Sequence, residues 1–249
     1  MYHDGILVGV GSGYFPNSSL TRAEGAALII RVIDKSRRVD VGDVPALPID
    51  GLEATGSCGQ LITVTSAGLS EHEALVNVYE QVGGVWLRKF KDLPAGVGSR
   101  GMMYNRRQNT NKSPAGIFGF VFAFGIMENP GMSTAWEYRT VTEQSYWVLD
   151  SSSPLYNRWS EGNTGFDDSE HLMSFGSQYN YALVIDFNYH SPVKGDGGAI
   201  FMHVATGDGK GTAGCVALAE ADLLGIMGWI DIAKNPKIII CPEADLPNF

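Results

Sequence analysis

The residues best suited to chemistry in this chain are a histidine and a cysteine toward its C-terminal end. His203 lies inside an apolar run, and Cys215 follows twelve positions later, after a glycine-rich loop. A close imidazole lowers the pKa of a thiol and accepts its proton, which makes a thiolate nucleophile. The spacing suits two neighbouring antiparallel strands joined by a loop, so we expect the two side chains to come within reach of one another across a hairpin.

Gly214, directly before the thiol, adds a third candidate catalytic residue. A glycine lets the backbone approach a substrate carbonyl, so the amides of Gly214 and Cys215 are candidates for an oxyanion hole. The reaction that this set supports is acyl transfer through a thioester. Spacing alone leaves a structural alternative open, because a cysteine in an apolar strand is commonly a small buried hydrophobe and a lone strand histidine is commonly structural.

Composition describes an ordinary folded protein that is rich in turns. Of 249 residues, 44% are hydrophobic and 18% charged, while 31 glycines and 10% aromatics favour β-structure over helical bundles. The net charge of −9 and the shortness of the basic clusters argue against a nucleic-acid partner. No apolar run approaches the ~20 residues of a membrane span. The first residues do not form a signal peptide, so either the chain is cytoplasmic or it begins downstream of a removed leader.

The sequence gives little support for a metal-binding or nucleotide-binding site. The three cysteines lack C-x-x-C spacing, which argues against a zinc knuckle and a disulfide scaffold, although a Cys58–Cys241 bridge stays open. The glycine-rich loop at 207–212 lacks the G-K-[ST] of a phosphate-binding loop. We therefore predict no metal and no cofactor. A zinc site is a weak alternative, because its candidate ligands have irregular spacing: His171, His190, His203 and Cys215.

The order of patterns predicts a small N-terminal segment (1–38), a linker rich in Pro, Gly and Asp (39–58) and a mainly β domain with minor α content (59–249). Gly83 and Gly84 form a two-residue hairpin turn. We expect loops at 93–107 and 151–170. The acidic stretch 167–170 is expected to be solvated surface or, alternatively, a contact for a cationic amine. Strands are expected at 60–65, 74–82, 85–90, 117–124, 137–141, 146–150 and 237–241, with a helix at 219–233.

Several motifs of the β domain occur together and in order. G-x-A-I-F-x-H-V leads to His203, T-A-G-C-V-A-L contains Cys215, and E-A-D-L-L follows. Upstream, S-P-A-G-I-F begins at Ser113, F-A-F-G follows it, and Y-N-R begins at Tyr156. From about residue 60 to 242 this order resembles the L,D-transpeptidase catalytic domain, the YkuD-type family of peptidoglycan-modifying enzymes.

The resemblance implies a β-sandwich or barrel with Cys215 as nucleophile and His203 as base. Its donor would be a peptidoglycan stem tetrapeptide attacked before the terminal D-Ala, and its acceptor a side-chain amine of another stem. It also implies acylation of the cysteine by carbapenems, no cofactor, and an extracytoplasmic, wall-associated location. On this interpretation the substrate-binding residues are Asn157, Asn188, Thr212 and Ala213; for the two asparagines, a purely structural role at a turn or strand end is the alternative.

Three positions depart from the family's commonest pattern. Ala213 replaces a second histidine, Ala217 stands where an arginine is common, and Val204 follows His203 in place of Gly or Ser. We expect a backbone carbonyl to orient the imidazole. Because substrate-contacting polar residues are replaced, two alternatives to transpeptidation stay open: an L,D-carboxypeptidase that hydrolyses the same stem peptides, and a non-catalytic cell-wall-binding protein.

The N-terminal segment carries a second resemblance. After a glycine-rich turn, Phe15 and Pro16 precede L-T-R-A-E, in which Thr21 caps a helix and Glu24 reaches back to the cap residue. This pattern resembles the S-layer homology module, which implies binding of an anionic secondary cell-wall polymer through Thr21, Arg22 and Glu24. The alternative is a remnant that only packs on the next domain.

Overall fold

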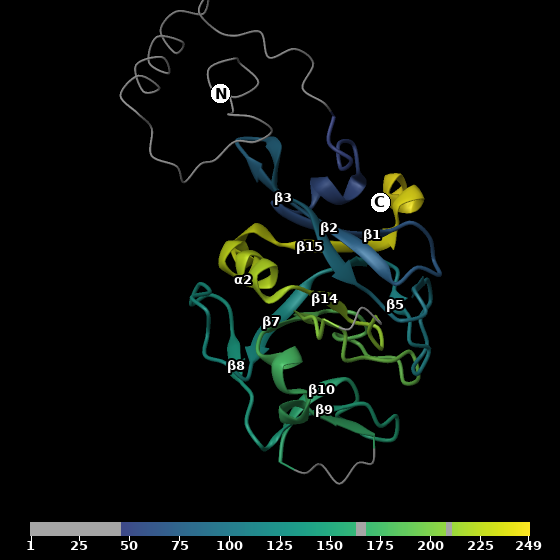
Figure 1. Ribbon diagram of the computed structural model, residues 1–249, viewed down its shortest axis with the longest axis vertical. Helices are drawn as coiled ribbons and strands as arrows, with labels where there is room; N and C mark the ends of the chain where they lie inside the picture. The colour runs from purple at the N-terminus through teal and green to yellow at the C-terminus, as the bar shows by residue number, and fades with distance from the viewer. Residues whose placement is uncertain (1–45, 163–167, 208–210) are drawn as a thin grey trace, which may run out of the picture. The chain divides into compact units, whose positions relative to one another are not determined.

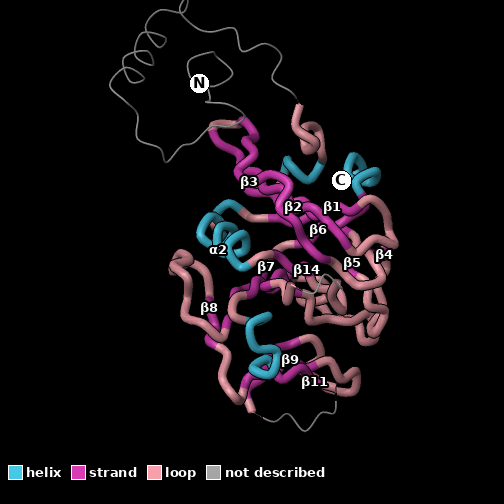
Figure 2. The backbone as a smooth tube through the Cα atoms, viewed as in Figure 1, coloured by secondary structure: helices cyan, strands magenta, loops and turns pink. Residues whose placement is uncertain are grey.

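A long curled β-sheet organises the part of the chain that the structure describes, residues 46–162, 168–207 and 211–249 of a computed structural model (Figure 1). The chain divides into two units, 1–46 and 47–249. The predicted N-terminal segment, with Thr21, Arg22 and Glu24, lies outside the described residues. In the second unit, the strands of the main sheet follow the order β6-β15-β1-β2-β3-β14-β13-β12-β7-β8. The expected mainly β fold with few helices is confirmed (Figure 2).

The elements have the following bounds. The main sheet consists of β1 (Gln60–Ser66), β2 (Glu73–Val82), β3 (Val85–Gly96), β6 (Gly116–Phe118), β7 (Phe120–Gly125), β8 (Tyr138–Thr140), β12 (Ala182–Ile185), β13 (Phe201–Val204), β14 (Val216–Leu218) and β15 (Lys237–Pro242). Two small sheets contain β9 (Ser145–Val148), β10 (Arg158–Glu161) and β11 (Ser169–His171), and β4 (Met102–Met103) with β5 (Ser113–Pro114). Helical segments are α2 (Glu220–Trp229) and the 3₁₀ turns η2 (Glu53–Gly56), η3 (Leu172–Tyr179), η4 (Ile232–Lys234) and η5 (Glu243–Asn248).

The hairpin of β2 and β3 forms as predicted. Gly83 and Gly84 both have positive φ, 59° and 83°, which is the geometry of a tight type I′ turn and is disfavoured for residues with a Cβ. Strand β3 then continues to Gly96, into the stretch predicted to be loop, because its second half pairs with β2 on one side and with β14 on the other. Long-range pairing therefore extends this strand beyond its apolar pattern.

The predicted strand at 117–124 is in fact two strands, and the break between them explains the curl of the sheet. Gly119 separates β6, which pairs with β15 at one edge, from β7, which pairs with β12 and β8 at the far end. Its amide donates to the Asp186 carboxylate over 2.8 Å. Since a single residue joins strands from opposite ends of the strand order, those ends must lie close together. The curl predicted as a sandwich or barrel arises at this point.

The antiparallel arrangement predicted for the strands of His203 and Cys215 is wrong. Strands β13 and β14 are neighbours but run parallel, with His203 in register with Ala217. Parallel neighbours require a return connection of about a dozen residues, and the chain between β13 and β14 has that length. Thr212 fixes the returning chain beside β3, because its amide donates to Val97 O and its carbonyl accepts from the Ser99 amide.

Three buried clusters surround the sheet. The largest includes Leu223 and Met227 of α2, which pack against one face. A second is aromatic, contains Phe124, Phe201 and Trp147, and includes Cys215 at its margin. A third, at the end of the domain, includes Ile49 and other residues of 47–58. The second half of the predicted linker therefore packs as part of the β unit.

The three cysteines are all buried and free. The Cys58 thiol donates to the Ala54 carbonyl over 3.3 Å, and Cys241 lies in β15, so the bridge between Cys58 and Cys241 does not form. Within the described residues, no helix is long and apolar enough to cross a membrane.

Candidate active site

His203 and Cys215 lie on the same face of two neighbouring strands. In the register of β13 and β14, Met202 is opposite Val216, which places Cys215 beside Phe201, and His203 beside Ala217. Because side chains alternate between faces, the thiol and the imidazole point to the same side and are diagonal neighbours. Parallel strands thus place the two residues on one face, where an antiparallel hairpin was expected.

The thiol is held against the backbone at the start of β13. Cys215 Sγ lies 3.2 Å from Ala199 O, to which it donates, and it accepts from the Phe201 amide at 3.4 Å. Burial raises the pKa of this thiol to about 12, and Glu170 adds to the rise, while the Phe201 amide and Arg106 oppose it. At neutral pH, Cys215 is therefore a neutral thiol.

The imidazole is held in one tautomer. Nδ1 of His203 lies 2.9 Å from Val204 O, and because a carbonyl oxygen only accepts, Nδ1 carries the proton and Nε2 is left as the basic nitrogen. The predicted backbone-carbonyl partner is confirmed. Burial lowers the pKa of the ring, with the Val204 hydrogen bond acting in the opposite direction. At neutral pH both the imidazole and the thiol are therefore uncharged.

Two hydroxyls hold the turn that carries the thiol. Thr212 Oγ1 donates to Cys215 O over 2.7 Å and accepts from the Gly214 amide at 3.0 Å. Ser113 Oγ, at the start of β5, donates to Gly214 O over 2.7 Å and accepts from the Gly98 amide at 2.9 Å. Ser113, known from the sequence only as a family landmark, therefore supports the turn that carries Cys215.

Gly214 occupies a position where a side chain would be crowded and its backbone conformation strained. Its φ is +150°, and a Cβ there would lie 3.0 Å from Lys112 O and 3.1 Å from Arg106 Nη2. Its amide is already bonded to Thr212, so the predicted role of this amide in an oxyanion hole requires the Thr212 hydrogen bond to be given up. Ala213, in contrast, is exposed, and a substrate can reach it.

Asn157 and Asn188 support the backbone behind the thiol. Asn157 is 1% exposed; its oxygen accepts from Trp147 Nε1 and the Ala199 amide, and its nitrogen donates to two carbonyls. The side chain of Asn188 holds the loop at 193–197: its oxygen accepts from the Val193 amide, and its nitrogen donates to the carbonyls of Val193 and Gly197. No polar group on Asn157 is left for substrate, so its position is that of a residue fixing Ala199, the acceptor for the thiol.

A carboxylate lies close enough to influence the thiol. Glu170, on β11, accepts from the Tyr179 hydroxyl over 3.0 Å, and burial raises the pKa of this carboxyl to about 7. Tyr179 is buried, and its ring lies edge-on to His203 with centroids 5.6 Å apart. From the sequence, this acidic stretch was expected to be solvated surface or, alternatively, a contact for a cationic amine; nothing in the pattern shows that η3 brings Tyr179 onto Glu170.

A wide cleft of about 1260 Å³ reaches the imidazole. Near the site it is lined by His203, Thr212 and Ala217, and it continues over β1, β2 and β3 past Thr63 and Asn77. Substrate can therefore approach His203 from the side of this cleft. The zinc ligands weighed above are dispersed: His171 stacks on Tyr146 and His190 lies near Asp186. Among the described residues, no three potential ligands gather.

Comparison with known proteins agrees with this geometry. Residues 71–240 match the model of the YkuD family, the L,D-transpeptidase catalytic domain. A comparison with curated proteins found no significant match. Among solved structures, the helical cell shape determining protein Pgp2 from Campylobacter jejuni is similar at 14% identity and a TM-score of 0.37; the match covers 73% of this chain and 46% of that one. The family match spans more than half of the sequence, and this chain belongs to the YkuD family of L,D-transpeptidase catalytic domains.

Proposed function

We propose that this protein is a peptidoglycan L,D-transpeptidase of the cell wall, which acts outside the cytoplasm and uses Cys215 as its nucleophile. The observation that carries the proposal is the placement of His203 and Cys215 on one face of β13 and β14, with Nδ1 of His203 committed to Val204 O. That hydrogen bond leaves Nε2 to exchange the proton, as an acyl-transfer mechanism requires.

The reaction proceeds in two halves. The thiol leaves Ala199 O, passes its proton to Nε2 of His203, and Sγ bonds to the carbonyl carbon of the donor stem peptide. The tetrahedral intermediate collapses when the bond to the terminal amino acid breaks, and the departing amine takes the proton from the imidazole. An acceptor amine then attacks the thioester, gives its proton to His203, and the thiol is restored.

The Cys215 amide is the nearest backbone donor for the oxyanion. The Gly214 amide joins it only if it exchanges the Thr212 hydroxyl for the substrate oxygen. Thr212 therefore determines how much of the oxyanion hole is available at the moment of attack.

Intact-mass analysis after incubation with a carbapenem tests the nucleophile. We expect the wild-type protein to gain the mass of one carbapenem and Cys215→Ala to gain none. Cys241→Ala is the matched control, because it removes another buried thiol and should label like wild type. Unchanged labelling of Cys215→Ala would refute the assignment.

Muropeptide products identify the acceptor. Incubation with stem tetrapeptides should give cross-linked dimers with wild-type protein and none with Cys215→Ala. Trimmed tripeptides without dimers would make the protein an L,D-carboxypeptidase. Folded wild-type protein that gives neither product while retaining wall binding would make it a non-catalytic wall-binding protein.

The partners in this proposal are peptidoglycan stem peptides and, through residues 1–38, an anionic secondary wall polymer. Binding of isolated polymer by the whole chain, lost on Arg22→Ala, would support the second partner. Equal binding by both proteins would remove Arg22 from that role.

A further inference from the structure

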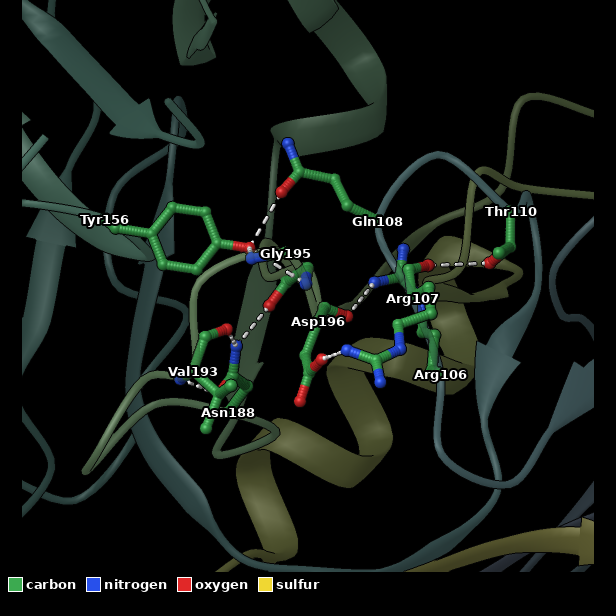
Figure 3. Close-up of polar contacts among 10 residues, drawn as sticks. Arg106, Arg107, Gln108, Thr110, Tyr156, Asn188, Val193, Gly195 and Asp196 are labelled. Atoms are coloured by element: carbon green, nitrogen blue, oxygen red, sulfur yellow. Dashed lines mark hydrogen bonds and ion pairs between the residues drawn. The ribbon is translucent and has the colours of Figure 1, made fainter. Parts of the chain in front are cut away.

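Arg106 lies beside Gly214, in the turn at 212–215 that carries the thiol. It comes from a distant part of the sequence, the segment between β4 and β5. It is 7% exposed. Its Nε donates to Lys112 O over 2.8 Å. Its Nη1 donates to Asp196 O over 3.3 Å (Figure 3). Both acceptors are neutral carbonyls. Within the described part of the chain, Nη2 has no acceptor and no carboxylate pairs with this guanidinium.

The neighbouring arginine, Arg107, shows the more common arrangement, in which an arginine pairs with a carboxylate. Arg107 is mostly exposed and pairs with the Asp196 carboxylate, as surface arginines commonly do (Figure 3). Burying a cation without a counter-charge is costly, and such a charge in a protein interior is normally paired. A guanidinium does not escape the cost by losing its proton. Among the described groups, Glu170 favours the charged guanidinium electrostatically but makes no hydrogen bond to it, so Arg106 can stabilise a further anion.

The free end of Arg106 lies next to Gly214, the residue before Cys215. Nη2 lies 3.1 Å from the point that a Cβ on Gly214 would occupy, the residue that immediately precedes the thiol. A Cβ on Gly197 would overlap Nη1, so glycine is needed there too. Arg106 lowers the pKa of Cys215, and in return the Cys215 thiolate is the group that most strongly favours the charged guanidinium.

The other charged or titratable groups near the thiol do not supply a positive charge. Glu170 opposes ionisation of the thiol, and the imidazole is held neutral by burial. Ala217, where the family commonly has an arginine, contributes no charge. The titratable groups that influence the site from the elements around it are Arg106, Glu170, Tyr179 and His203.

We propose that Arg106 supplies the positive charge that stabilises negative charge developing on Cys215, in place of the arginine absent at position 217. The guanidinium reaches the thiol from the loop before β5 and so needs no arginine within the nucleophile motif. The inference rests on the proposed function only in taking Cys215 as the reactive thiol.

Alkylation of Cys215 with iodoacetamide between pH 7 and 11 tests this charge without any peptidoglycan substrate. The thiolate forms a bond to the reagent's methylene carbon and iodide leaves, so the rate follows the thiolate fraction, which is read by mass spectrometry of the Cys215 peptide. We expect Arg106→Gln to slow labelling about three- to tenfold at a given pH, the consequence of a pKa higher by about half a unit to one unit. Arg106→Lys should stay close to wild type, and Arg107→Gln, the adjacent surface control, should not change it.

Equal pH profiles for wild type and a folded Arg106→Gln would overturn the inference. If Arg106→Gln does not fold, Arg106→Lys decides: wild-type labelling supports the role of charge, and a tenfold fall with intact circular dichroism overturns it. The result is independent of the proposed function. A shifted profile without muropeptide products would refute only the transpeptidase, and an unshifted profile with products would refute only the role of Arg106.

Discussion

Removal of the Ser113 hydroxyl should destabilise the domain and, at the same time, disturb the turn that carries Cys215. Ser113 is fully buried, and its single oxygen both accepts from the Gly98 amide and donates to Gly214 O. In Ser113→Ala both backbone groups lose their partner in a place that water cannot easily reach. Each orphaned group costs ~1–3 kcal/mol, so we expect a loss of about 3 kcal/mol in the free energy of unfolding.

For a domain of this size, that loss corresponds to a melting temperature lower by roughly 6–12 °C. Urea denaturation followed by tryptophan fluorescence gives the free energy, and differential scanning calorimetry gives the melting temperature. Carbapenem acylation of Cys215, measured well below the melting temperature, should also slow, because Gly214 is released from one of its two hydroxyl supports.

Ser113→Thr is the matched control. It keeps the hydroxyl. We expect its stability and acylation rate to remain near wild type. If the free energy of unfolding of Ser113→Ala lies within about 0.5 kcal/mol of the wild-type value, the range of an ordinary surface substitution, the two hydrogen bonds do not contribute the stability expected of them.

Two further substitutions test the surroundings of the thiol. Gly214→Ala forces a Cβ to within 3.0 Å of Lys112 O at a φ that glycine favours, so we expect a loss of ~1–3 kcal/mol in urea denaturation and slower acylation of Cys215; wild-type stability would contradict the close approach. Glu170 has a pKa of about 7, so it is charged above neutral pH and neutral below, and its charge opposes ionisation of the thiol. Glu170→Gln should therefore speed iodoacetamide labelling at pH 9 and leave it unchanged at pH 5.5; equal acceleration at both values would point to a steric cause.

Local pattern was sufficient for much of the sheet. The β2–β3 hairpin could be predicted because Gly83 and Gly84 fix a tight turn between two strand-like runs. The strand at 237–241 and the helix after Leu218 also followed from periodicity, although α2 ends at Trp229, before the predicted end. These elements depend on neighbours in sequence, which a single sequence displays.

The pairing between strands that are distant in sequence could not be predicted from the sequence. Whether β13 and β14 run parallel depends on the path of the chain between them, and Thr212 fixes that path by its backbone hydrogen bonds to Val97 and Ser99, just after β3. The division of 117–124 at Gly119 depends on the two ends of the sheet meeting, which no local pattern encodes. The order of strands and the curl of the sheet are properties of the whole domain.

For the candidate site, too, only the residues in contiguous motifs could be predicted from the sequence. His203 and Cys215 could be found because their motif is contiguous, and the carbonyl partner of the imidazole could be expected because no side chain nearby could serve. Arg106 could not be found, since an arginine in a glycine-rich loop gives no signal of its own. Asn157 was predicted as a groove residue and proves to be saturated by internal hydrogen bonds, a difference that only the surrounding backbone reveals.

The pairing of β1 with β15 determines when during folding this site can exist. Leu61 lies opposite Lys237, and the Ala54 amide donates to the carbonyl of Phe249, so the first and last parts of the domain close on each other. Contacts between residues so far apart in sequence form slowly, because the entropy of loop closure must be overcome before they contribute stability. The central strands that carry His203 and Cys215 lie between elements from both ends. The thiol therefore acquires its environment only when synthesis of the domain is essentially complete, and an emerging chain carries an unformed site.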